Sequence, residues 1–105
     1  MKIIINNKVF IVEKADTFFK RLVGLMFKKN IKKGLFIPKC NNIHTFFMKE
    51  NIDVIMLNKN NKVILIEKNL KKNKIILKKE AYHTIELPYN SINKLKLGET
   101  LIIKN

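Results

Sequence analysis

The sequence predicts an α+β fold that is mostly β, with a small barrel or rolled antiparallel or mixed sheet and one capping helix. Short runs rich in Ile, Val and Phe alternate with turn residues, which is typical of strands. Only residues 16–27 show a clear helical period. The 105 residues, 47% of them hydrophobic, suffice for one core. We therefore expect a single domain over residues 1–105.

The first element is a hairpin. Residues 2–5 and 9–12 are β-branched or aromatic runs, and "NNK" separates them. Asparagine is a favoured residue in tight hairpin turns, so the two runs are expected to pair as antiparallel strands.

A helix is expected next, over residues 16–27. Its apolar stripe has the spacing i, i+4, i+7 and i+8 and consists of Phe18, Leu22, Leu25 and Met26. Asp16 or Thr17 can cap its start. Arg21 lies about 60° from Phe18 around the helix, so its guanidinium can reach whatever the helix packs against.

The remaining elements are short strands. We expect strands at "LFI" (35–37, ended by Pro38), "IHTFFM" (43–48), "DVIML" (53–57), "VILIE" (63–67), "KIILK" (74–78), "HTIEL" (83–87) and "ETLIIK" (99–104). The loop "NKNNK" predicts a hairpin between the third and fourth of these runs. Residues 91–98, "SINKLKLG", fit either one helical turn or a loop.

The stretch from Cys40 to Met48 is a candidate site. On a continuous strand, one face would carry Cys40, Asn42, His44, Phe46 and Met48. Large apolar groups on both faces predict a strand that is buried on both sides or lines a cavity. Cys40 and His44 would lie about 13 Å apart, too far to share a metal ion or form a catalytic dyad. With no CxxC or HxxxH motif, neither a metal nor a cofactor is expected.

Charged residues within apolar runs complete the expected site. Asp53 begins a strand and can face the mouth of the barrel, and Glu86 lies inside "TIELP". Burial of a charge costs several kcal/mol unless the charge is paired, so Arg21 is the expected partner, in a structural ion pair or a ligand clamp. The predicted binding residues are Arg21, His44, Phe46, Met48, Asp53 and Glu86.

The net charge of +14 is large, but of the 22 basic residues only Arg21 is arginine. Excess Lys, Asn and Ile is typical of AT-rich coding sequence, and purpose-built phosphate readers usually use arginine. The longest apolar runs are far shorter than the roughly 20 residues needed to cross a bilayer. We expect a soluble cytoplasmic protein without membrane contact.

Several motifs together resemble the family called domain of unknown function 192. They are "RLVGLMF", "GLFI", "IHTFFM", "IDVIML", "VILI", "TIELP" and "LGETLII", in this order. The resemblance implies a compact β-rich domain and brings no established activity. Three positions depart from the family pattern: Tyr89–Asn90 replaces an Ala-Gly pair, Gly98–Glu99 a Gly-Asp turn, and Asn51 a proline.

Three functions follow from these residues. The first is a non-enzymatic module that binds a small anionic ligand or a peptide in a polar and aromatic cleft, with Arg21 gripping a carboxylate or phosphate. The second is a small-molecule hydrolase or lyase, in which His44 or Asp53 is the general base and Arg21 stabilises developing charge. The third is nucleic-acid binding through the lysines.

Overall fold

The computed structural model describes residues 1–15, 17 and 31–105. Its strands are β1 Lys2–Ile5, β2 Lys8–Lys14, β3 Gly34–Pro38, β4 Asn42–His44, β5 Ile52–Leu57, β6 Val63–Leu70, β7 Ile75–Leu77, β8 His83–Pro88 and β9 Ile102–Lys104. Apart from Thr17, the expected helix over residues 16–27, with Arg21, lies outside the described residues. Residues 91–98 form a loop with turns, not a helical turn.

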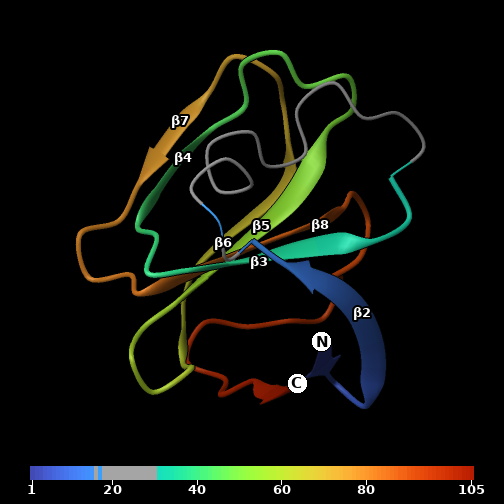
Figure 1. Ribbon diagram of the computed structural model, residues 1–105, viewed down its shortest axis with the longest axis vertical. Helices are drawn as coiled ribbons and strands as arrows, with labels where there is room; N and C mark the ends of the chain where they lie inside the picture. Colours follow the sequence, from blue (N-terminus) through green and yellow to red (C-terminus); the bar gives the residue numbers. More distant parts are fainter. Residues whose placement is uncertain (16, 18–30) are drawn as a thin grey trace.

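Seven strands form one mixed sheet in the order β6-β5-β8-β3-β2-β1-β9 (Figure 1). The pairing of β2 with β3 is parallel, and the others are antiparallel. The start of β6 meets the segment before β9: Val63 N donates to Glu99 O at 2.8 Å, and Gly98 N donates to Val63 O at 2.9 Å. The sheet therefore curls into a half-barrel, which confirms the predicted mostly β, rolled mixed sheet.

The first hairpin forms as the sequence predicts. Ile5 pairs with Lys8, so Asn6 and Asn7 alone make the turn. Their φ angles are 50° and 67°. A two-residue turn with positive φ at both positions matches the right-handed twist of the strands, and asparagine tolerates this conformation better than most residues.

The central strand β5 is buried on both faces of the sheet. Alternate residues of β5 point to opposite sides, and all six of its residues are buried. The first core cluster comprises Ile3, Ile5, Val12, Phe36, Ile55, Leu57, Val63, Ile85, Leu87, Ile92, Leu95 and Leu101. The second core cluster comprises Ala15, Leu35, Ile37, Ile43, Met48, Ile52, Val54, Met56, Leu70 and Ala81.

A separate two-stranded ribbon, β4 with β7, lies beside the main sheet (Figure 1). Ile43 pairs with Ile76; Ile43 belongs to the second core cluster, and Ile76 packs against that cluster. By strand alternation, the neighbouring pairs place Asn42, His44, Ile75 and Leu77 on the opposite face of the ribbon.

The expected strand over residues 43–48 is wrong beyond His44. The buried Thr45 Oγ1 donates to Lys71 O at 2.7 Å and accepts from Lys74 N at 2.8 Å, so the chain is fixed there by a neighbouring loop. The chain then turns, and Phe47 takes a φ of 63°. Phe46 is 37% and Phe47 65% exposed, so a strand buried on both sides does not form.

Candidate functional site

The structure places Asp53 and Glu86 on opposite faces of the sheet. Asp53 lies opposite Leu87, which belongs to the first core cluster, whereas Glu86 lies opposite Val54, which belongs to the second. Residues directly opposite each other across a ladder share a face. The two buried carboxylates therefore do not meet at one end of the half-barrel.

Asp53 binds one residue of β6 and one residue of the loop after β8. It is 1% exposed, its Oδ1 accepts from Asn69 N at 2.8 Å, and its Oδ2 accepts from Ser91 N at 2.7 Å. Hydrogen bonds to an ionised carboxylate are among the stronger ones in proteins. Asp53 thus fastens the end of β6 and the chain that leaves β8 to the start of β5.

His44 and Met48 lie in different surroundings from Asp53. His44 is half-buried on β4, its Nδ1 accepts from Phe46 N at 3.3 Å, and its ring stacks on Phe46 with centroids 5.1 Å apart. Met48 is buried in the second core cluster. The predicted set is thus distributed over several parts of the fold, and Arg21 lies outside the described residues.

Three pockets meet at the corner that follows β8, which we call the Pro88–Lys94 corner. Pockets of about 220, 450 and 210 Å³ all have Asn90 in their lining. Asn90 has a φ of 65°, a conformation that glycine and asparagine favour. Asparagine can therefore stand at a position where the resemblance to the domain of unknown function 192 family implies glycine. Sequence reasoning noted this position only as a departure from the family pattern.

The corner is tied down by polar contacts. Ser91 N binds Asp53, Ser91 Oγ donates to Pro88 O, and Lys68 Nζ donates to Asn93 O at 3.0 Å. These bonds come from three separate strands or loops. The corner is therefore bonded to residues of β5, β6 and β8.

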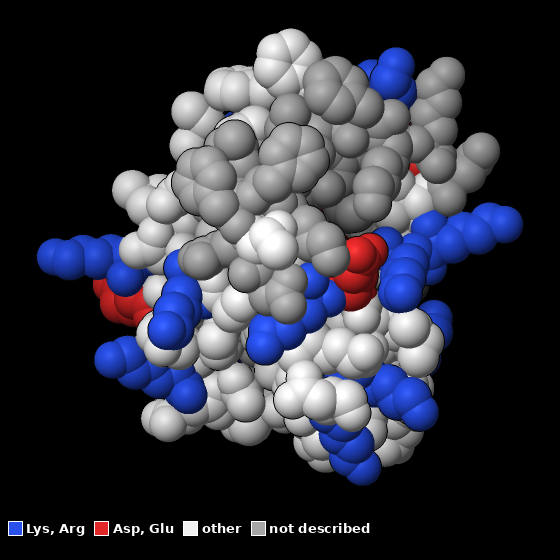
Figure 2. All heavy atoms as spheres, in the orientation of Figure 1, with Lys and Arg blue, Asp and Glu red and all other residues white. Residues whose placement is uncertain are grey.

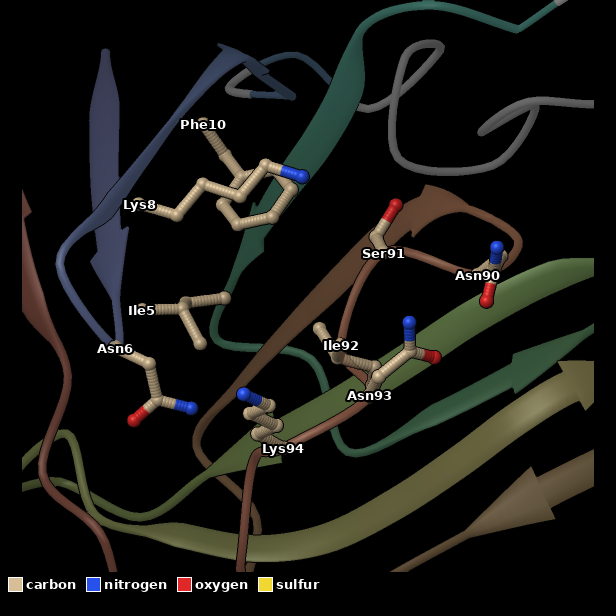
Figure 3. Close-up of a pocket in the computed structure, with 9 residues that line it drawn as sticks. All are labelled: Ile5, Asn6, Lys8, Phe10, Asn90, Ser91, Ile92, Asn93 and Lys94. Atoms are coloured by element: carbon tan, nitrogen blue, oxygen red, sulfur yellow. The ribbon is translucent and has the colours of Figure 1, made fainter.

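The first pocket lies between the β1–β2 hairpin and the loop after β8 (Figure 3). Its lining residues are Ile5, Asn6, Lys8, Phe10, Asn90, Ser91, Ile92, Asn93 and Lys94. None of these is acidic. The Lys8 ammonium lies 5.1 Å from the centroid of the Phe10 ring, which keeps a positive charge at the pocket wall.

The other two pockets add Lys32 and Lys68, together with two carboxylates. Both carboxylates are engaged by backbone amides, since Glu50 Oε1 accepts from Ile31 N at 3.0 Å and Asp53 binds as described. The linings of the three pockets together contain four lysines, Lys8, Lys32, Lys68 and Lys94, and two carboxylates, Glu50 and Asp53, so positive charge is in excess at the corner.

Within residues 1–15, 17 and 31–105, no group of three His, Cys, Asp or Glu side chains is placed to hold a metal ion. In the same part of the chain, no helix has the length and apolar character required to span a bilayer.

His83 is a titratable group that the structure places half-buried between aromatic rings. Its ring lies 4.9 Å from that of Phe36 and 4.7 Å from that of Tyr82. Its Nδ1 accepts from Lys39 N at 3.3 Å. Burial, and secondarily the positive charge of Lys14, lower the pKa of His83 from its usual value of 6.5.

This lowered pKa predicts acid sensitivity. The unfolded chain binds the proton more tightly than the folded one, so the contribution of neutral His83 is complete above pH 6.5 and is lost as the pH falls through the lowered pKa. We expect the free energy of unfolding, measured by urea denaturation between about pH 7.5 and 5, to fall with pH more steeply in the wild type than in His83→Gln. Equal slopes would contradict this assignment.

Comparisons with known proteins agree with the fold and the motifs. The model of the family domain of unknown function 192, described as an uncharacterized ACR family, matches residues 1–103. The UPF0127 protein of Thermococcus kodakarensis is 37% identical over 94 residues, covering 84% of this chain and 60% of that protein. The UPF0127 protein of Pyrococcus furiosus is 34% identical over 88 residues, covering 79% and 76%. This chain thus spans less than two thirds of the Thermococcus protein.

Two crystal structures share the fold. One is a protein of unknown function from Novosphingobium aromaticivorans, with a TM-score of 0.80, 16% identity and coverage of 97% of this chain and 82% of that chain. The other is a candidate transcription regulator from Sinorhizobium meliloti, with a TM-score of 0.82, 16% identity and coverage of 96% and 89%. The family match over nearly the whole sequence shows that this chain belongs to the domain of unknown function 192 family.

Proposed function

We propose that this protein is a non-enzymatic module that binds a small anionic molecule at the Pro88–Lys94 corner. The observation that carries the proposal is the first pocket, where Lys8 and Lys94 come from distant parts of the sequence and line one hollow without an acidic neighbour in its lining (Figure 3). The side-chain amides of Asn6 and Asn93 supply further donors.

The size and the chemistry of the pocket limit the ligand. The volume of the pocket, about 220 Å³, is below the roughly 300–1,000 Å³ typical of pockets that bind drug-sized ligands. Ammonium and amide donors favour phosphate or carboxylate oxygens, and Ile5, Phe10 and Ile92 form an apolar wall. The proposed ligand class is therefore a small phosphate- or carboxylate-bearing compound.

The other two functions have less support in the described residues. For the hydrolase or lyase, both oxygens of Asp53 already accept from main-chain N–H groups, and Arg21 lies outside the described residues. For nucleic acid, one clustered basic face would be expected. Figure 2 instead shows lysines that project from several sides of the visible face.

Removal of either pocket lysine is expected to weaken anion binding. Lys8→Ala and Lys94→Ala should each raise the Kd for inorganic pyrophosphate about fivefold, because each deletes a charge-assisted hydrogen bond worth about 1 kcal/mol in this partly open site. The measurement is isothermal titration calorimetry at low salt, where surface charges are least screened.

Lys79→Ala is the matched control, because Lys79 is exposed and lines none of the three pockets. It removes the same charge and should leave the Kd within about twofold of the wild-type value. An equal loss of affinity in all three variants would mean that pyrophosphate responds to net charge alone, and the proposal would fail.

A further inference from the structure

The strand β7 has an open edge at the margin of the fold (Figure 1). Thr45 N donates to Lys74 O and Lys78 N donates to Asn41 O, both at 2.9 Å, so the main chain of Lys74 and Lys78 faces β4. In an antiparallel ladder, every second residue directs its N–H and C=O groups toward the partner strand, and the residues between them direct theirs away. On β7, Ile76 therefore faces β4 as Lys74 and Lys78 do. The main-chain groups of Ile75 and Leu77 therefore point outward, and no described residue pairs with them.

The side chains at this edge are also uncovered. Ile75 is 68% and Leu77 67% exposed, and both lie on the same face of β7. By strand alternation, Lys74 and Lys78 belong to the other face, together with Ile76. An edge strand with exposed apolar side chains and unpaired main-chain groups is a template for another extended chain.

We propose that the open edge of β7 docks an extended acidic peptide whose residues alternate between apolar and acidic. The main chain of the peptide forms hydrogen bonds with the main chain of Ile75 and Leu77, and its apolar side chains cover the side chains of these two residues. Its carboxylates lie opposite the ammonium groups of Lys74 and Lys78. A second copy of this chain is disfavoured, because Lys74 and Lys78 would meet their own counterparts and each copy carries a net charge of +14.

This surface is separate from the Pro88–Lys94 corner. Neither Ile75 nor Leu77 lines any of the three pockets there. A failure of pyrophosphate to bind at the corner would leave the β7 proposal standing, and the reverse also holds.

The test uses a capped seven-residue peptide of alternating glutamate and valine, titrated into the full 15N-labelled chain. We expect amide chemical-shift changes centred on Ile75 and Leu77, and slower hydrogen exchange of these two amides in the complex. A peptide of alternating lysine and valine should cause neither change. Shifts that avoid β7, or that are equal with both peptides, would overturn the proposal.

Charge reversal gives the matched comparison. The double variant Lys74→Glu/Lys78→Glu should raise the Kd of the acidic peptide about tenfold, since two favourable cross-strand charge pairs become repulsive. The double variant Lys33→Glu/Lys104→Glu carries the same net charge at exposed sites away from β7 and should change the Kd by less than about threefold.

Equal losses of peptide affinity in the two double variants would contradict the proposed register.

A third titration uses vesicles of anionic phospholipid. If these vesicles perturb Ile75 and Leu77 while the peptide does not, the surface is a lipid-binding one and the peptide proposal is wrong.

Discussion

Replacement of Asp53 by alanine is expected to lower the free energy of unfolding by about 3 kcal/mol. Asp53 is 1% exposed, and its two oxygens accept from the main-chain N–H groups of Asn69 and Ser91. Alanine leaves both donors without a partner, and each unsatisfied donor costs about 1–3 kcal/mol when it stays buried. Urea denaturation followed by circular dichroism measures the change.

Two further variants test this explanation. Asp53→Asn keeps one oxygen that can accept from one N–H group, but its own NH₂ meets the other, so an intermediate loss is expected. Glu80→Ala removes an exposed carboxylate and should change the stability by less than about 0.5 kcal/mol. An Asp53→Ala protein as stable as the wild type would show that Asp53 does not anchor the corner.

Replacement of Gly34 by alanine is expected to cost about 3 kcal/mol. A Cβ atom at this position would lie 2.5 Å from Leu87 Cδ2, 2.7 Å from Glu86 O and 3.0 Å from Val12 Cγ1. The carbonyl belongs to the main chain of β8, which pairs with β3, so it cannot withdraw without disturbing the ladder. Denaturation with urea should show a lower midpoint with little change in the m-value.

Gly98→Ala is the matched glycine control. At Gly98 the nearest heavy atom to an added Cβ is Lys62 Cε at 3.9 Å, so no clash arises. Its φ of 92° makes alanine unfavourable by about 1 kcal/mol for a conformational reason alone. A Gly34→Ala loss no larger than that of Gly98→Ala would contradict the steric explanation.

Strands that carry their own periodic pattern and turn residues could be predicted from the sequence. The first hairpin, the strand ended by Pro38 and the hairpin around "NKNNK" all form. In each case the signal is local: asparagine tolerates positive φ, and proline cannot continue a central ladder.

The end of β4 could not be predicted, because its cause is not local. Thr45 bonds to Lys71 and Lys74, and these partners lie 26 and 29 residues away along the chain. The sequence "IHTFFM" does not predict that Thr45 contacts the loop that contains Lys71 and Lys74. The β-rich composition therefore suggested a longer strand and a buried Phe46–Phe47 pair.

The candidate site was missed for a similar reason. Asp53 was correctly placed at the start of a strand, but its partners Asn69 and Ser91 follow from the curl of the sheet and not from spacing in the sequence. Lys8 and Lys94 lie far apart in the sequence, and no local pattern connects them. Only the tertiary fold brings the first hairpin beside the loop after β8.

The most direct test of anion binding at the Pro88–Lys94 corner is an NMR titration of the full 15N-labelled chain with inorganic pyrophosphate. Binding at the corner predicts saturable shift changes that are largest at the amides of Asn6, Asn90 and Asn93. These changes should weaken in Lys8→Ala and Lys94→Ala and persist in Lys79→Ala. Small, non-saturating changes spread over lysines on all sides of the protein would contradict the account.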